Sequence, residues 1–127
     1  MLNHIEADNV PAARGPYSHA VVAGDFVYTA GQIPVNFETG QLVGDDIHVQ
    51  VKQVMLNLGQ VLAASGATFA QVVKATVYLA DMDDFTPMNT VYAEFMADHR
   101  PARACVEVAK LPLGCKVEID LVAYTGD

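Results

Sequence analysis

Arg103 and Glu118 are the two residues whose types and positions best suggest chemistry. Each lies in a segment of alternating character, over 102–109 and 116–124. If these segments are neighbouring strands, alternation places both side chains on one face of a sheet. An arginine fork binds a carboxylate through two hydrogen bonds, and a nearby carboxylate can orient or activate water. Cross-strand salt bridges are common, so spacing alone favours a structural pair over a site.

Three further residues are candidates, each with an ordinary structural alternative. Cys105 lies two residues from Arg103, but no histidine is near in sequence to lower its pKa, so we expect a packing residue whose backbone could serve a site. Tyr17 follows a stiff Gly-Pro step and either closes a pocket or packs in the core. Asn89, one turn into an expected helix, is more often a solvated helix residue than a ligand.

The remaining patterns exclude several classes of function. The four histidines have neither i, i+4 spacing nor partner acids, so we expect no metal site. No glycine-rich nucleotide loop is present, and no Ser, His and Asp constellation stands out. The formal net charge is -8, with 15 acids against 7 bases and no basic run. This balance argues against a nucleic-acid partner and against an anionic membrane surface.

Length and composition indicate one domain over residues 1–127. Hydrophobic residues make up 52% of the chain, enough for a core, and the charged fraction of 17% suggests that part of the surface is hidden in an oligomer. Two cysteines are too few for a disulfide framework. With no secretory pattern at Met1–Glu6 and no apolar run of about 18 residues, we expect a cytoplasmic protein.

The periodicity of apolar residues predicts the order β-β-α-β-α-β-β. A short strand over 3–6 and an edge strand near Gln41-Leu42 are weaker additions. Asp45 or Asp46 should cap the first helix, and Gly66 should follow it. The expected elements are two strands within 18–30 separated by Gly24-Asp25, a helix over 45–65, a strand over 71–80, a helix over 85–99, and strands over 102–109 and 116–124.

These elements predict an α+β fold with a single mixed sheet and both helices on one face, because two helices cannot cover two faces well. The short Pro/Gly connection between the last two strands predicts an antiparallel hairpin. In strand 71–80 we expect Val73, Ala75, Val77 and Leu79 on one face. The helix-free face, buried against another copy of the chain, is expected to carry Tyr78, Arg103, Cys105, Glu107, Glu118 and Asp120.

Three segments together resemble one family. They are PAARGPYSHAVVAGDFVYTAGQIPVN at 11–36, KATVYLADMDDFTPMNTVYAEF at 74–95 and PARACVEVAKLP at 101–112. They are similar to the Rid family, also called the reactive intermediate deaminase or YjgF-like family, over essentially the whole chain. Gly-Pro-Tyr, Gly-Gln-Ile-Pro and Pro-Ala-Arg with Cys-Val-Glu-Val are specific in combination.

The resemblance implies a chorismate mutase-like fold and a homotrimer whose sheets form a central β-barrel-like core, with clefts between subunits. It implies hydrolysis of reactive 2-imino acids such as 2-iminobutanoate and 2-iminopropanoate, or their enamine tautomers, to 2-oxo acids and ammonia, without a cofactor. Carried over by position, Arg103 binds the substrate carboxylate, Glu118 positions or activates water, and the Cys105 backbone holds water or the substrate nitrogen. Substrate-binding positions would be Tyr17, Ala30, Gly31 and Asn89.

Two departures from the family pattern bear on activity. Ala30 stands where the deaminase subgroup often has serine, with Thr29 one place earlier, and the segment 98–100 is short where relatives have a longer one with an aromatic. Either change could alter the pocket. The alternatives are a non-catalytic sensor that binds small carboxylates through Arg103, and an endoribonuclease or translation inhibitor, against which the net charge counts. A chaperone-like secondary role has still weaker support.

Overall fold

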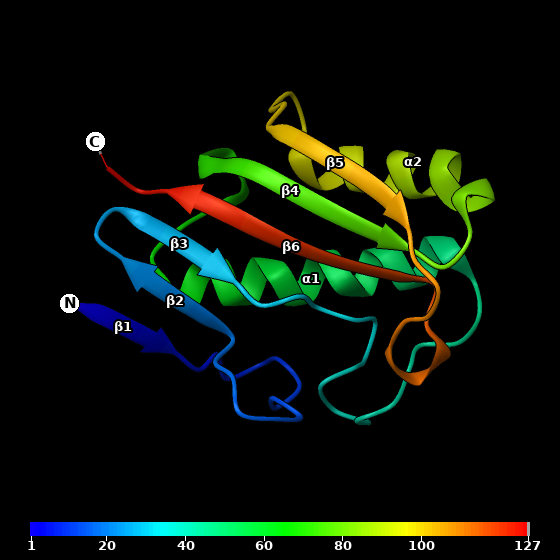
Figure 1. Ribbon diagram of the computed structural model, residues 1–127, viewed down its shortest axis with the longest axis horizontal. Helices are drawn as coiled ribbons and strands as arrows, with labels where there is room; N and C mark the ends of the chain where they lie inside the picture. Colours follow the sequence, from blue (N-terminus) through cyan, green and yellow to red (C-terminus); the bar gives the residue numbers. More distant parts are fainter. Residues whose placement is uncertain (127) are drawn as a thin grey trace.

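The computed structural model describes residues 1–126 as one six-stranded mixed sheet with two helices packed on one face (Figure 1). The sheet order is β1-β2-β3-β6-β4-β5. The strands are β1 (Leu2–Ile5), β2 (Ala20–Ala23), β3 (Phe26–Thr29), β4 (Val72–Leu79), β5 (Ala102–Glu107) and β6 (Val117–Tyr124). The helices are α1 (Ile47–Ala64) and α2 (Phe85–Met96), with short 3₁₀ helices η1 (Phe69–Gln71), η2 (Met82–Asp84) and η3 (Pro112–Gly114). The predicted α+β architecture is confirmed.

The local turns and caps form largely as the sequence predicts. The Asp46 carboxylate caps α1 by accepting from the backbone N–H groups of His48 and Val49. Gly66 follows the helix with φ of +80°, a conformation that favours glycine. β2 and β3 pair antiparallel across Gly24-Asp25, and β1 adds to the edge of β2. The expected strand near Gln41-Leu42 reduces to a single bridge between Val35 and Leu42.

α2 ends earlier than predicted. Its last residue is Met96, and Ala97 adopts a left-handed φ of +53° that turns the chain away from the helix axis. The His99 ring then donates from Nε2 to the backbone carbonyl of Val72 at 2.6 Å, which fastens this turn to the start of β4. His99 and Arg100 therefore lie outside the helix, between α2 and β5.

The predicted hairpin between the last two strands is wrong. β5 pairs with β4 in parallel, while β6 lies between β3 and β4 and is antiparallel to both. The inward residues of β6 explain this position, because they fill the centre of the core, which an edge strand could not do. These residues are Val117, Ile119, Leu121 and Ala123, all fully or almost fully buried.

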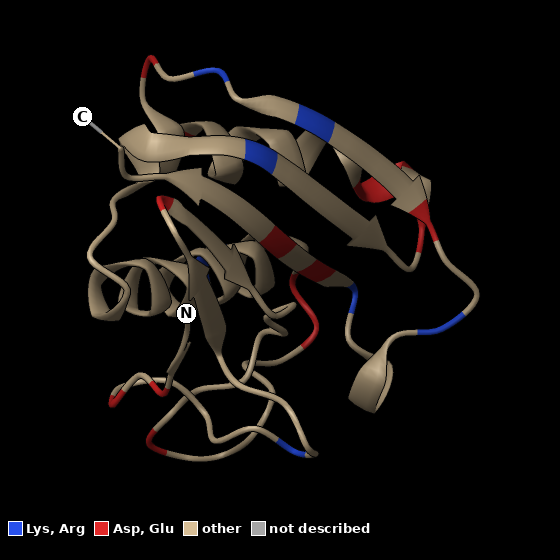
Figure 2. Cartoon of the chain, turned by 60° about the vertical axis from the view of Figure 1, so that its left-hand side comes forward, with Lys and Arg blue, Asp and Glu red and all other residues tan. Residues whose placement is uncertain are grey.

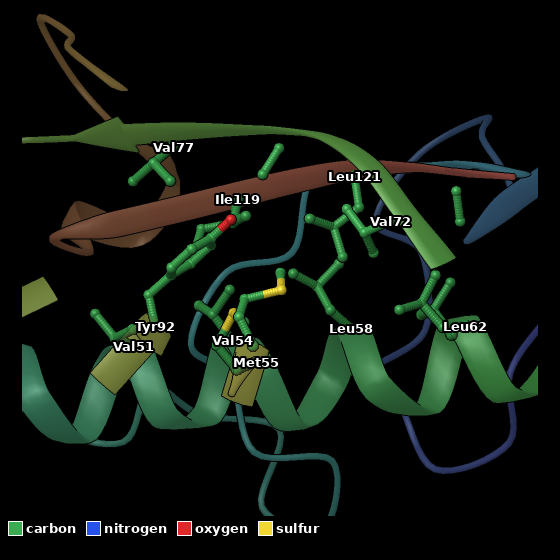
Figure 3. Packing of buried hydrophobic residues seen from close by; sticks show 14 of the residues in the cluster. Val51, Val54, Met55, Leu58, Leu62, Val72, Val77, Tyr92, Ile119 and Leu121 are labelled. Carbon is green, nitrogen blue, oxygen red and sulfur yellow. The ribbon is translucent and has the colours of Figure 1, made fainter. Parts of the chain in front are cut away.

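The core lies between the sheet and the two helices. Figure 3 shows the α1 side chains directed at the inner face of β4 and β6, with the Tyr92 ring reaching into the same layer from α2. A bulge between Val72 and Lys74 changes the expected face of β4, so that Val72 is buried and Val73 is exposed. Ala75, Val77 and Leu79 point inward as predicted.

The helix-free face differs from the prediction in β5. Tyr78, Glu118 and Asp120 do lie on it, since Glu118 pairs with Tyr78 and Asp120 with Thr76, away from the buried positions. Arg103, Cys105 and Glu107 instead pair with the inward-facing Ala75, Val77 and Leu79, and so face the helices. The large exposed apolar side chains of this face are Leu2, Phe26, Tyr28, Val106 and Tyr124.

Candidate active site

The Arg103 guanidinium is held above two aromatic rings of α2. Its central carbon lies 4.9 Å from the ring centre of Tyr92 and 5.5 Å from that of Phe85. This arrangement arises because β5 is the edge strand and its helix-facing side meets α2. Aromatic faces attract a guanidinium, and they fix its plane without using its N–H donors. The donors of Arg103 are therefore available to a ligand.

The expected salt bridge between Arg103 and Glu118 does not form. The two side chains lie on opposite faces of the sheet, in strands separated by β4. Figure 2 shows the basic position of β5 in blue and the acidic positions of β6 in red, with β4 between the two strands. Among residues 1–126, no carboxylate lies within 4.0 Å of the Arg103 guanidinium. Sequence alternation correctly groups Arg103 with Cys105 but does not say which face the pair takes. A salt bridge within the chain is therefore not the role of Arg103 and Glu118.

A cavity of about 430 Å³ opens beside Arg103, between α2 and the turn that follows it. Asn89 contributes its side chain from α2, so the structure brings Asn89 and Arg103 together as expected of a shared site. We call this cavity the arginine pocket. Its lining residues are Asn89, Tyr92, Ala93, Met96, His99, Arg100, Pro101 and Arg103.

Cys105 lies next to Arg103 along β5 and packs partly against the core. Burial raises the pKa of its thiol, and the positive charge of Arg103 only partly opposes that effect. A raised pKa keeps the thiol protonated near neutral pH, and the thiol form is a poor nucleophile. This environment agrees with the packing role rather than with covalent catalysis.

Glu118 lies on the other face of the sheet and depends on Gly31 for space. The chain after β3 runs beside β6, where Gln32 donates its N–H to Ile119 O at 2.9 Å and accepts the Ile119 N–H at 3.2 Å. A Cβ atom at position 31 would overlap the Glu118 carboxylate and lie 2.9 Å from its Cδ. A side chain at position 31 would therefore displace the carboxylate from this position.

The Glu118 carboxylate is half-buried and close to a second acid. Burial raises its pKa, and the negative charge of Asp120 raises it further. Asp120 is itself engaged, because the Tyr78 hydroxyl donates to its Oδ2 at 2.9 Å. Glu118 has no hydrogen-bond partner of its own among the described residues. A carboxylate in this condition is suited to exchange a proton with water or a ligand.

Tyr17 and Ala30 share a separate cavity of about 650 Å³, near the β2–β3 hairpin. Tyr17 is 49% exposed, which rules out the core role that its sequence allowed. Its hydroxyl accepts from the Arg14 N–H at 3.3 Å, and it also lines a small pocket with Gly31. The Thr29 Oγ1, one place before Ala30, accepts the Leu121 N–H at 3.0 Å.

The candidate residues thus form two groups within one chain. Arg103, Cys105 and Asn89 lie on the helix side, and we call them the arginine group. Glu118, Gly31, Tyr17 and Ala30 lie on or beside the helix-free side, and we call them the glutamate group. The arginine pocket contains no member of the glutamate group, and the two cavities that contain Tyr17 hold no member of the arginine group.

Sequence reasoning missed four residues of the arginine pocket and its floor. The sequence predicts a helix over 85–99, which makes Phe85 and Tyr92 apolar helix residues. Their spacing of two helical turns places both rings under Arg103. The same prediction puts His99 at the helix end and Arg100 just after it. Both residues line the pocket because the chain turns at Ala97. Glycine is the usual sequence signal for such a turn, and this position has alanine.

No helix in residues 1–126 is long and apolar enough to cross a membrane. Within the same residues, no group of three or more His, Cys, Asp or Glu side chains is placed to hold a metal ion.

Comparison with known proteins places this geometry in a family. The family described as Endoribonuclease L-PSP, the YjgF/RidA family, matches residues 7–125 of the chain. The chain belongs to this family. The resemblance drawn from the three sequence segments is confirmed. Rid-family relatives that are similar over nearly the full chain carry different names.

A RutC family protein of Pyrococcus horikoshii is 47% identical over 124 residues, covering 98% of both chains. The human protein named 2-iminobutanoate/2-iminopropanoate deaminase is 42% identical over 122 residues, covering 96% of this chain and 89% of the human one. The crystal structure of E. coli TdcF with bound serine superposes with a TM-score of 0.93 at 36% identity, covering 98% and 99% of the two chains.

Proposed function

We propose that the protein hydrolyses 2-imino acids to 2-oxo acids and ammonia, at sites shared between copies of a homotrimer. The observation that carries the proposal is the Arg103 guanidinium, stacked on Tyr92 and Phe85 with no ion pair among residues 1–126. A fixed cation without an anion is a binding site for a small carboxylate. The human relative named for an imine deaminase supports the reaction class.

The placement of the two groups supports a shared site. Arg103 and Glu118 face opposite sides of one sheet, so a single chain cannot direct both at one small ligand. The helix-free face beside Glu118 carries large exposed apolar side chains, including Phe26, Tyr28 and Tyr124. Apolar surface of this kind is typical of an interface between subunits. In the trimer, the arginine group of one copy would meet the glutamate group of the next.

The reaction needs orientation and proton transfer rather than a covalent nucleophile. Arg103 would hold the substrate carboxylate and Asn89 would complete the wall, fixing the imine carbon near Glu118 of the neighbouring copy. With the imine protonated on nitrogen, Glu118 would accept a proton from water as the water oxygen bonds to the imine carbon, giving a neutral carbinolamine. Glu118 would return that proton to the nitrogen, and as the C–N bond breaks the hydroxyl proton would pass to Glu118. The products are ammonia and the 2-oxo acid, and Glu118 releases the last proton to solvent.

The test is imine hydrolysis by the purified protein. An amino acid dehydratase that releases 2-iminobutanoate supplies the substrate, and semicarbazide traps the imine that remains. We expect the protein to reduce the semicarbazone yield, and Arg103→Ala and Glu118→Ala each to abolish that effect while the oligomer stays intact. Equal hydrolysis by wild type and Arg103→Ala would contradict the site.

A ligand-sensing role is the second candidate, favoured by the E. coli TdcF structure with bound serine. A sensor would use Arg103 to hold a 2-oxo or amino acid but would not need Glu118. Calorimetry separates the two functions. If Glu118→Ala binds 2-oxobutanoate as tightly as wild type, and no imine is hydrolysed by wild type, the protein is a sensor.

A further inference from the structure

The arginine pocket carries more positive charge than one carboxylate requires. Arg100 and Arg103 both line it, while none of its other lining residues is acidic. These are two of only three arginines in a chain with 7 basic residues and a formal net charge of -8. Concentrating two cations in one cavity of an acidic protein indicates a ligand with more than one negative charge.

Arg100 is exposed at the rim of the pocket, but its guanidinium is bonded to the chain that it follows. Its Nη1 donates to the backbone carbonyls of Ala97 at 2.6 Å and His99 at 3.0 Å, at the turn that ends α2. These bonds fix the guanidinium at the rim of the pocket and leave Nε and Nη2 without a partner among the described residues. His99 cannot substitute for it through Nε2, which donates to Val72 O.

Arg100 and Arg103 also act on the same aromatic ring. Tyr92 is only 7% exposed, and its hydroxyl has no hydrogen-bond partner within residues 1–126. Burial raises the pKa of this phenol, and the charges of Arg103 and Arg100 both oppose the rise. Both guanidinium groups therefore lie within electrostatic reach of Tyr92, from different chain segments, around one cavity of about 430 Å³.

We propose that the arginine pocket selects 2-imino acids that carry a second carboxylate on the side chain. Arg103 holds the carboxylate next to the imine carbon, and Arg100 holds the distal one. The assignment of Arg103 rests on the proposed function, whereas the role of Arg100 deepens it by naming the substrate class. The matched four-carbon pair is 2-iminosuccinate, with two carboxylates, and 2-iminobutanoate, with one.

The experiment measures kcat/KM for both imines, produced in place by amino acid oxidases, with wild type and three variants. Arg100→Ala removes the cation, and Arg100→Gln removes the charge but keeps a donor for the turn carbonyls. Lys52→Ala, an exposed α1 change outside every cavity described, controls for net charge. We expect wild type to prefer the diacid, and both Arg100 variants to lower the diacid-to-monoacid ratio about tenfold, equal to about 1.4 kcal/mol.

Lys52→Ala should leave that ratio unchanged. A wild-type preference for the monoacid, or a ratio unaffected by both Arg100 variants, would overturn the proposal while leaving imine hydrolysis intact. If neither imine is hydrolysed, the proposed function fails. Calorimetry then tests separately whether the pocket binds a dicarboxylate more tightly than a monocarboxylate. Tighter binding of 2-oxoglutarate than of 2-oxopentanoate, lost in Arg100→Gln, would then support the diacid pocket, and equal binding would contradict it.

Discussion

The arginine group and the glutamate group hold their key side chains by opposite means. Arg103 is supported from below by the rings of Tyr92 and Phe85, which leave its donors free. The Glu118 carboxylate lies in the space that a side chain at Gly31 would fill, and it is half-buried beside Asp120. The first region presents a cation that is unpaired among the described residues, and the second a carboxylate with a raised pKa. In the proposed function, each region supplies what the other lacks.

The largest expected effect comes from the arginine group. Arg103→Ala removes the cation on which carboxylate binding depends, so kcat/KM for imine hydrolysis should fall about 100-fold or more, equal to roughly 3 kcal/mol. Arg103→Lys keeps the charge but loses the planar fork, and should recover only part of the loss. Steady-state kinetics with the semicarbazide assay provides the measurement. Full activity in Arg103→Lys would show that charge alone suffices.

A side chain at position 31 should disrupt the packing of the glutamate group, because it fills the space that the Glu118 carboxylate occupies. Gly31→Ala puts a methyl group where the Glu118 carboxylate lies. The atoms that must move are the end of a flexible side chain, so we expect the lower end, about 1 kcal/mol, of the usual cost of overpacking. Thermal unfolding should show the loss, and adding Glu118→Ala should relieve most of it. Gly15→Ala is the matched control, because its Cβ would meet only the Tyr17 ring at an ordinary 3.7 Å. If Gly31→Ala unfolds at the same temperature as Gly15→Ala, the close packing of Glu118 against Gly31 is contradicted.

A smaller effect concerns the charge on Glu118. Because its pKa is raised on folding, the folded state holds this proton more tightly than the unfolded state does. Stability is therefore lost as pH rises from the ordinary carboxyl pKa through the raised one, and the penalty stays constant above it. Glu118→Gln should raise Tm at pH 7, and the gain should vanish at acidic pH. A Tm difference that does not change with pH would argue against this titration.

The smallest effect should come from Cys105. Its raised thiol pKa and its packing against the core give no role to a thiolate, so Cys105→Ala should keep kcat/KM within about threefold of wild type. Treatment with iodoacetamide at pH 7 should likewise leave imine hydrolysis nearly unchanged. A hundredfold loss in a folded Cys105→Ala protein would instead identify a nucleophile.

The sequence predicts the local elements well because their causes are local. The Asp46 cap, the turn at Gly24 and the apolar stripe of α1 all act within a few residues. The strand order is set by which strand fills the centre of the core, and no short-range pattern shows that β6 enters between β3 and β4. The hairpin rule therefore fails for β5 and β6, even though their connection contains proline and glycine.

The candidate site is predictable in its residues but not in its geometry. Alternation groups Arg103 with Cys105 and Glu118 with Asp120. The sequence predicts all four on the helix-free face, because polar residues are expected to point away from a core. β5 is an edge strand, so its apolar side chains can face away from the helices while Arg103 stacks on α2. Only the pairing of Arg103 with the buried Ala75 reveals the two separate groups.

Mixed oligomers test the shared site most directly. Arg103→Ala and Glu118→Ala chains with different tags are co-expressed, and trimers carrying both tags are purified and assayed. A trimer with both tags holds two copies of one variant and one of the other, so one of its three sites combines an intact Arg103 with an intact Glu118. Imine hydrolysis should therefore return to about one third of the wild-type level. Mixtures of Arg103→Ala with the double variant supply the inactive control. Mixed trimers no more active than this control would contradict a site shared between copies.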